Sequence, residues 1–206
     1  MNILENLNWR YATKRMTGEG IDKEKTATIL EAIRMAPTSL GLQPFKVLVI
    51  ENKEIREKMK PVCFDQPQIT ESAYVLVFAV YKDNYTQLAD DYINLVAKTR
   101  NQSIESLEDY KNRIMYYITG KDNTAWAARQ AYIAFGFGLA TAAMLHVDTT
   151  PMEGFNPEEL DKVLDLENKG LKSVVIMAVG KRDANNDYLV NLPKVRKAEE
   201  DFFIHL

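Results

Sequence analysis

The feature that most constrains the fold of this chain is a long helical pattern from Asn123 to His146, in which apolar residues occur on most sides of the helix. A surface helix carries a single apolar stripe, so a helix that is apolar nearly all round is buried, either in a large core or in a subunit interface. Within it, Gly136 and Gly138 resemble part of a dinucleotide-binding fingerprint, but no strand precedes them. The two glycines therefore favour close packing against a neighbouring element.

The composition is that of one ordinary globular domain. The chain has 206 residues, of which 46% are hydrophobic and 27% charged, which is enough for a single hydrophobic core and unlike a disordered chain. No repeat or Pro/Gly/Ser-rich linker divides it. The formal net charge of −3 does not favour nucleic acid as a partner.

Shorter apolar runs indicate strands between the helices. Ala73–Val80 and Ser173–Val179 are continuously apolar, as strands buried on both faces are, and Lys46–Ile50 is a shorter strand. Further helices are predicted at Asp22–Met35, at Lys53–Met59, at Pro157–Leu164 and over most of Tyr85–Ile118. The pattern predicts an α+β fold with three or four strands and more helices than strands.

No segment is typical of export or of a membrane span. The start, Met1–Arg10, lacks the apolar core of a signal peptide, and the apolar runs are far shorter than the roughly 20 residues that a membrane helix needs. Cys63 is the single cysteine; it excludes an internal disulfide, fits a reducing compartment and is expected to be a small buried hydrophobe. We expect a soluble cytoplasmic protein without a membrane partner.

The common catalytic motifs are missing, since the chain has no phosphate-binding loop, no nucleophile elbow and no Cys-x-x-Cys pair. His146 and His205 have no cysteine or acidic neighbours at metal-ligand spacing, so we expect no metal site.

Three polar clusters remain as candidate ligand sites. Arg10–Arg15 is rich in charged and hydrogen-bonding side chains, and Ala36–Phe45 is a turn-rich linker that offers hydroxyls and backbone N–H groups. Leu192–Arg196 places Lys194 and Arg196 two residues apart, which in an extended chain points both cations to the same side. Each cluster taken alone is equally compatible with a solvated surface or a plain turn.

Together these segments resemble the nitroreductase family, in that family's order and spacing. The shared motifs are Arg10-x-x-Thr13-Lys14, Pro37-Thr38-Ser39-x-x-x-Gln43-Pro44, Pro151-Met152-Glu153-Gly154-Phe155 and Leu192-Pro193-Lys194-x-Arg196. No single motif is diagnostic, but the resemblance runs from about Leu7 to the C-terminus. It is weakest from Tyr85 to Lys121.

The resemblance implies a nitroreductase-like α+β fold, with a central mixed, mostly antiparallel sheet flanked by helices, in an intertwined homodimer. Residues 1–206 would form one FMN-binding domain, with a C-terminal tail from about 183 to 206 extending onto the partner subunit. The apolar long helix and the apolar end of the tail, Phe202–Ile204, independently favour such an interface.

The resemblance also implies which residues bind FMN. Arg10, Lys194 and Arg196 would hold the 5′-phosphate, in agreement with the affinity of guanidinium and ammonium groups for phosphate. Lys14 would approach the N1/O2 edge of the ring, where a positive charge stabilises the reduced flavin. The other positions that match cofactor-binding positions of the family are Tyr11, Ala12, Pro37, Thr38, Ser39, Gly41, Asp65, Gln68, Gln130, Pro151, Met152, Glu153 and Gly154.

Within that set, Thr38 and Ser39 would come from the partner subunit, and Gln130 would face the flavin from across the interface. Three positions depart from the family. Ala12 stands where many relatives carry Ser, Gly41 where Asn is common, and Gln68 where some members have Lys. Trp126 and Tyr132 are expected to pack in the core or the interface.

The implied activity is an NADH- or NADPH-driven, ping-pong hydride transfer that reduces a small aromatic acceptor, namely a nitroaromatic, a quinone or a free flavin. The cofactor carries the chemistry, so no catalytic side chain is expected. The alternatives are a same-fold flavin reductase or oxidative dehydrogenase, a flavin-binding module without turnover, and a helical interaction protein without a cofactor.

Overall fold

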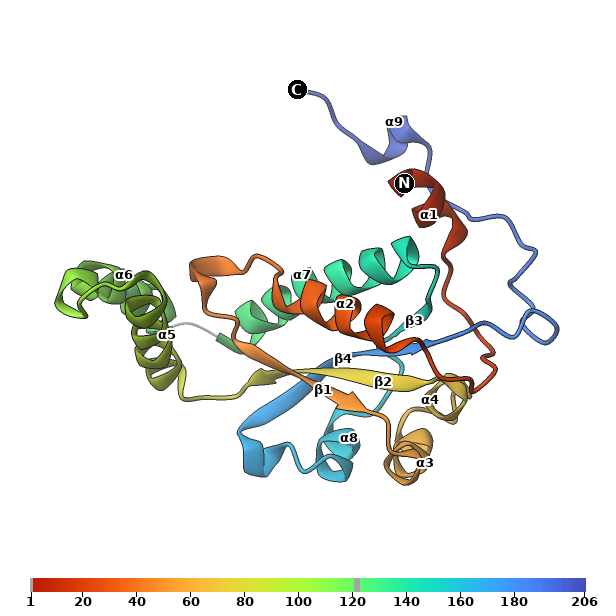
Figure 1. Ribbon diagram of the computed structural model, residues 1–206, viewed down its shortest axis with the longest axis horizontal. Helices are drawn as coiled ribbons and strands as arrows, with labels where there is room; N and C mark the ends of the chain where they lie inside the picture. The colour runs from red at the N-terminus through yellow and green to blue at the C-terminus, as the bar shows by residue number, and fades with distance from the viewer. Residues whose placement is uncertain (1, 121–122) are drawn as a thin grey trace.

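Figure 1 shows the computed structural model, which describes residues 2–120 and 123–206. Met1, Lys121 and Asp122 lie outside the described residues. Of the ranges considered in the sequence, Met1–Arg10 and Tyr85–Lys121 each have one end there. A four-stranded sheet with strand order β1-β2-β4-β3 lies between two layers of helices. The strands are β1 (Phe45–Ile50), β2 (Tyr74–Tyr81), β3 (Asp148–Met152) and β4 (Leu171–Gly180).

All three strand pairings are antiparallel, and the sheet's one described parallel contact is a single bridge between Ala12 and Thr149. The predicted α+β class is therefore confirmed, and the expected mixed character of the sheet reduces to that bridge.

The helices are α1 (Ile3–Trp9), α2 (Lys23–Arg34), α3 (Lys53–Val62), α4 (Gln68–Glu71), α5 (Tyr85–Arg100), α6 (Glu108–Ile118), α7 (Asn123–Met144), α8 (Pro157–Val163) and α9 (Glu199–Phe202), with 3₁₀ turns η1 (Ser39–Gly41), η2 (Glu105–Leu107) and η3 (Glu167–Lys169).

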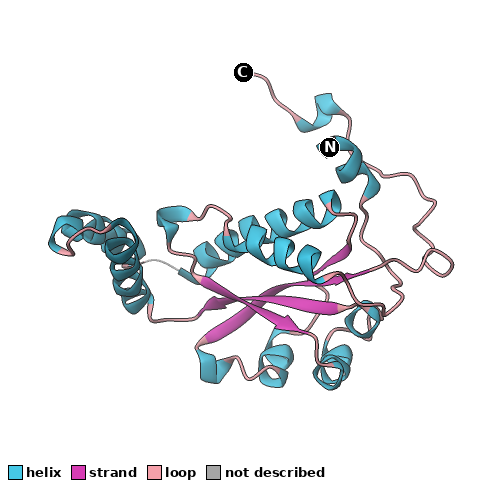
Figure 2. Cartoon of the chain, in the orientation of Figure 1, coloured by secondary structure: helices cyan, strands magenta, loops and turns pink. Residues whose placement is uncertain are grey.

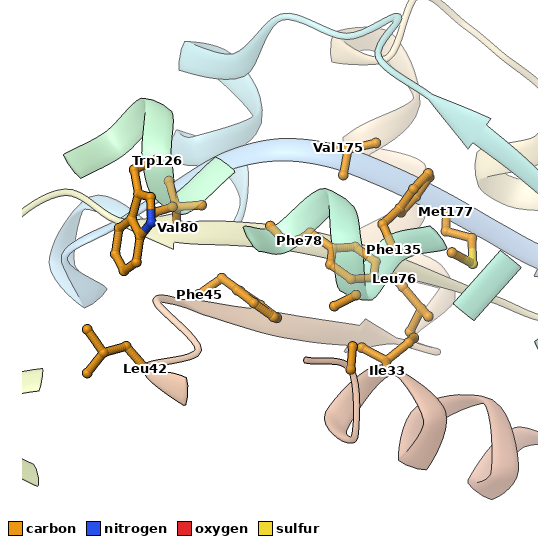
Figure 3. Close-up of a cluster of buried hydrophobic side chains, with 14 of the residues drawn as sticks. Ile33, Leu42, Phe45, Leu76, Phe78, Val80, Trp126, Phe135, Val175 and Met177 are labelled. Atoms are coloured by element: carbon orange, nitrogen blue, oxygen red, sulfur yellow. The ribbon is translucent and has the colours of Figure 1, made fainter. Parts of the chain in front are cut away.

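The central strands β2 and β4 are buried on both faces, as their apolar runs predict. Alternate side chains of β2 point to opposite sides, so Leu76 and Phe78 pack under α2 and α7, while Val75 and Val77 pack against α3 and α8. Figure 3 shows the first of these cores, with Phe135 of α7 set edge-on against Phe78 at 5.3 Å between ring centroids. The two cores fix the layers seen in Figure 2.

Two sequence predictions need correction. Strand β3 was not predicted, because Asp148–Met152 is polar at its start and contains Pro151, which is tolerated only because β3 lies at the edge of the sheet. The single helical region predicted over Tyr85–Ile118 is two helices, since Asn101 ends α5 with a left-handed backbone, φ 52°. The two helices project from one end of the sheet (Figure 1).

Helix α7 is buried only in part. It packs on α2 and on the sheet, and Gly138 allows this approach because a Cβ there would lie 2.9 Å from Cγ1 of Ile33 and 3.1 Å from Cε of Met177. The close-packing interpretation of Gly138 is thus confirmed. On its other side α7 exposes Tyr132, Ile133 and Phe137 by 36–43%. No described helix is long and apolar enough to cross a membrane.

We expect Gly138→Ala to destabilise the fold by about 1–3 kcal/mol, the usual result of adding a group to a full core. Gly136 is the matched control, because it lies in the same helix and nothing is within 4 Å of the position of its Cβ. Gly136→Ala should leave stability unchanged or raise it by up to ~1 kcal/mol through helix propensity. Urea unfolding of both variants measures the difference, and equal stabilities would contradict the packing argument.

Candidate functional site

The candidate site is built around the extended segment that follows α1, and a buried carboxylate fixes that segment. Asp187, which is 3% exposed, accepts hydrogen bonds from the Tyr11 hydroxyl at 3.0 Å and from the Lys14 backbone N–H at 2.7 Å. Its other oxygen accepts from the Leu189 backbone N–H at 2.9 Å. Asp187 therefore ties the segment after α1 to the beginning of the C-terminal tail.

A second buried carboxylate, Asp148, joins the same segment to the sheet edge. It accepts from Nε of Arg182 at 2.7 Å, from the Arg182 backbone N–H at 2.9 Å and, at 3.4 Å, from the Thr13 hydroxyl. The Arg182 guanidinium in turn contacts the rings of Trp9 and Tyr11, at 4.2 and 4.6 Å from their centroids. A charged group between two aromatic faces holds both rings in place.

With both segments fixed, three cations meet at one place. Arg10 follows α1, and Lys194 and Arg196 lie on the tail; the ε-ammonium of Lys194 donates to the backbone carbonyls of Leu7 and Arg10. These residues line a cavity of about 360 Å³ between the chain start and the tail. Among the residues that the structure describes, no carboxylate forms an ion pair with any of the three cations.

The lowered pKa values of Arg10 and Lys194 reflect first their burial and then the crowding of like charges. Burial, and then the charge of Arg196, lowers the pKa of Arg10. The pKa of Lys194 is lowered by burial, then by Arg10 and Arg196. Because each lowered pKa means that the protonated form is disfavoured, an anion placed among the three groups would relieve the repulsion.

The backbone carbonyl of Thr13 connects this segment to two further parts of the chain that were predicted to bind the cofactor. It accepts from the Thr150 hydroxyl and, at 3.3 Å, from Nε2 of Gln68. Gln66, two residues earlier, donates from Nε2 to the carbonyl of Gly154 at 2.6 Å. The segments after α1, before α4 and after β3 are thus joined by hydrogen bonds within one chain.

The structure sorts the predicted site residues into two groups. A first group lies around the segment after α1 and comprises Arg10, Tyr11, Ala12, Lys14, Asp65, Gln68, Pro151, Met152, Glu153, Gly154, Lys194 and Arg196. The second group comprises Gln130 on α7 and the loop Pro37, Thr38, Ser39 and Gly41 at the end of α2, where Oε1 of Gln130 accepts from the Ser39 backbone N–H at 2.8 Å.

Helix α7 lies between the two groups. Gln130 reaches the Ser39 loop on one face of the helix, while the Tyr132 hydroxyl donates to Glu153 of the first group. Residues two apart in an α-helix point about 200° apart, so these two side chains leave α7 on opposite faces. Trp126, which is 4% exposed, packs in the core as expected, whereas Tyr132 is 36% exposed in the single chain and its expected place in a subunit interface stays a prediction.

The two buried carboxylates and Gln66 were not predicted. Asp187 lies in the polar run Asp183–Asp187, where no spacing separates it from its exposed neighbours. Gln66 acts through backbone carbonyls, and Asp148 acts through one backbone N–H and through side chains more than 30 positions away; such partners leave no pattern in the sequence.

The residues present fit a phosphorylated cofactor with a polar ring edge. Nε of Arg10 is buried without a hydrogen-bond partner, as is Oε1 of Gln68. Buried polar atoms of this kind are uncommon, and a ligand is one reason for their presence. The three cations supply the charge that a phosphate dianion requires.

A sequence model of the Nitroreductase family matches residues 7–181 of the chain. The chain belongs to the nitroreductase family. The Major NAD(P)H-flavin oxidoreductase of Aliivibrio fischeri is 34% identical over 212 residues, covering 97% of this chain and 96% of that protein. A protein assigned as an NAD(P)H nitroreductase in Staphylococcus haemolyticus is 34% identical over 176 residues, covering 81% and 80%.

Solved structures confirm the nitroreductase fold. An assigned nitroreductase of Bacillus subtilis superposes with a TM-score of 0.85 at 22% identity and covers 98% of both chains. Another, from Exiguobacterium sibiricum in complex with FMN, superposes with a TM-score of 0.84 at 20% identity, over 100% of this chain and 98% of its own.

In this nitroreductase-family chain, we expect Asp187→Asn to loosen the segment after α1, because one acceptor oxygen is replaced by a donor that faces two other donors. The loss of a hydrogen bond to a charged group corresponds to about 1.5–3 kcal/mol of local stability. Trypsin cleavage after Lys14 or Arg15, followed by mass spectrometry, should become at least about tenfold faster. Asp183→Asn is the control, because this half-buried carboxylate of the same run accepts from Asn185 and Asn186 and not from the segment after α1; equal cleavage rates would contradict the role of Asp187.

Proposed function

We propose that this chain is an FMN-dependent, NAD(P)H-oxidising reductase of flat, electron-poor acceptors: nitroaromatics, quinones or free flavins. The observation that carries the proposal is the meeting of Arg10, Lys194 and Arg196 around one cavity without a paired carboxylate among the described residues. The family match, the FMN complex of a neighbour and the names of the relatives support it. The buried free thiol of Cys63 supports a cytoplasmic location.

The first group of residues would hold the cofactor from one chain. Arg10, Lys194 and Arg196 would bind the phosphate, and Lys14, whose backbone is fixed by Asp187, would bring its charge to the N1/O2 edge of the ring. Gln68 has a free acceptor for the pyrimidine end. The backbone N–H groups of Glu153 and Gly154 would face N5.

Bound FMN would accept a hydride from NADH or NADPH and then reduce an acceptor in a separate half-reaction, which is a ping-pong scheme. The chain's own contribution is to position the ring and to fix its electrostatic surroundings. Lys14 would favour negative charge on the ring edge that it approaches. The Tyr132 hydroxyl holds the Glu153 side chain and so steadies the strand end beside the ring.

The same proposal requires a homodimer. Pro37–Gly41 and Gln130 lie across α7 from Glu153, so in one chain they do not converge on the first group, whereas a second copy would supply them. The exposed apolar side chains of α7 and of the tail end, where Phe202 and Ile204 are 67% and 87% exposed, support burial in such an interface. We propose that the tail from about residue 183 extends onto the partner.

Replacing the apolar tail end should weaken the dimer. We expect the wild-type chain to elute as a dimer at micromolar concentration, and the triple variant Phe202→Ser, Phe203→Ser and Ile204→Ser to dissociate at concentrations about tenfold higher or more. Light scattering after size-exclusion chromatography measures the mass. Ile104→Ser, an exposed apolar residue outside the tail, should have no effect, and a monomeric wild type would count against the whole site.

The visible absorption spectrum of the purified protein tests the function. We expect flavin bands that bleach when NADH or NADPH is added without oxygen. Arg196→Ala should weaken FMN binding about 10- to 100-fold, the loss of a charged hydrogen bond, without lowering the melting temperature of the FMN-free protein, since it removes a repelling charge. Lys197→Ala, the neighbouring exposed cation, is the control.

The outcomes separate the rival functions. Bound FMN that NAD(P)H does not bleach would indicate a flavin-binding module without turnover. FMN retention unaffected by Arg196→Ala would overturn the phosphate assignment. Of the acceptors, free flavin is favoured by the relative named as a flavin oxidoreductase, and turnover with flavin, quinone and nitroaromatic acceptors would rank them.

A further inference from the structure

The loop that carries Thr38, Ser39 and Gly41 has an unusual backbone. Leu40 has φ 59°, Gly41 φ 73° and Gln43 φ 45°. Left-handed conformations are uncommon for residues other than glycine, and an apolar residue such as Leu40 adopts one only when its surroundings enforce it. The loop needs partners that hold this shape.

Two tyrosines from α5 and α6 are those partners. The Tyr110 hydroxyl of α6 donates to the carbonyl of Leu40 at 2.8 Å. The ring of Tyr92, on α5, stands edge-on to that of Tyr110 with 6.3 Å between centroids. Burial and the hydrogen bond with Tyr92 raise the pKa of Tyr110 to about 12, so the Tyr110 hydroxyl stays protonated and able to donate at neutral pH.

The tip of Tyr92 fills the space beside Gly41. A Cβ on residue 41 would lie 2.7 Å from Cζ of Tyr92 and closer still to its hydroxyl oxygen. Residue 41 therefore has no room for a side chain while Tyr92 keeps this position. A tyrosine hydroxyl from another helix thus takes the space that a side chain of residue 41 would need.

We propose that Tyr92 and Tyr110 are positioning residues of the cofactor loop, and that the Tyr92 hydroxyl replaces the side chain that residue 41 lacks. The inference rests on the proposed function, in which this loop lines the FMN site of the partner subunit. It predicts that residues 41 and 92 act as a matched pair, so that FMN affinity depends on their combination.

A double-mutant cycle on the full-length dimer tests the pair. Gly41→Asn should weaken FMN binding about tenfold, because the new side chain collides with Tyr92, and Tyr92→Ala should weaken it by a similar factor through loss of the loop's support. If the two substitutions acted independently, their losses of FMN affinity would multiply in the double variant. The double variant should instead bind FMN at least about tenfold more tightly than that, the coupling expected of residues in contact. Asn tolerates the left-handed backbone of residue 41.

Gly120→Asn is the matched control. Gly120 has the same φ, 73°, but no atom of the described residues lies within 4 Å of the position of its Cβ, so its substitution should leave FMN affinity unchanged. Melting curves recorded without FMN for every protein of the cycle check that all variants fold. Additive effects in a wild-type protein that binds FMN would overturn this inference alone, while a wild type that binds no FMN would overturn the proposed function and the inference with it.

A second pair of variants separates positioning from general stability. Tyr110→Phe removes the hydrogen bond to Leu40, and Tyr85→Phe removes an equivalent one, since the Tyr85 hydroxyl donates to the Tyr81 carbonyl at 2.6 Å. We expect only Tyr110→Phe to weaken FMN binding, by about three- to tenfold, and to shift the reduction potential of the bound FMN. Equal effects of the two variants would show a structural role only.

Discussion

The close contact of α7 with the sheet decides where every other part of the candidate site lies. Because Gly138 has no side chain, the helix sits directly against Ile33 of α2 and Met177 of β4, and it runs between the two groups of site residues. Gln130 and Tyr132 then leave it on opposite faces. The helix that packs in the core of the chain therefore also separates the two groups of site residues, and its outward face keeps apolar residues that the core does not use. In the proposed homodimer, that face would pack against the partner subunit.

The cation cluster shows how a fold can be built for a ligand at some cost to itself. Lowered pKa values at Arg10 and Lys194 mean that the protonated groups are less favourable in the folded chain than in the unfolded one. The resulting destabilisation is present at neutral pH and declines as pH rises through the lowered pKa of Lys194. Asp148 and Asp187 are close by, but backbone N–H groups, Arg182 and Tyr11 already occupy them. They shape the cluster without neutralising it, which leaves its charge for the anion that the proposed function places there.

The sequence was sufficient for the layers of the fold and for the residues that lie within each motif. Apolar runs placed β2 and β4. It was not sufficient for contacts between distant segments. Asp187 acts on Tyr11 and Lys14 from more than 170 positions away, and a buried carboxylate that accepts from backbone groups looks like any other aspartate. Strand β3 was not predicted because an edge strand needs no apolar alternation.

The region that resembles the family least supplies the loop's most specific support. Helices α5 and α6 lie between Tyr85 and Ile118, yet Tyr92 and Tyr110 contact the backbone at Leu40 and Gly41. Helices outside the loop can thus fix its backbone without any change in the loop's own hydrogen-bonding residues, because the ring of Tyr92 occupies the space beside Gly41. In such a chain the identity of residue 41 has little meaning by itself. A side chain at residue 41 would collide with Tyr92, so the two positions have to be interpreted together.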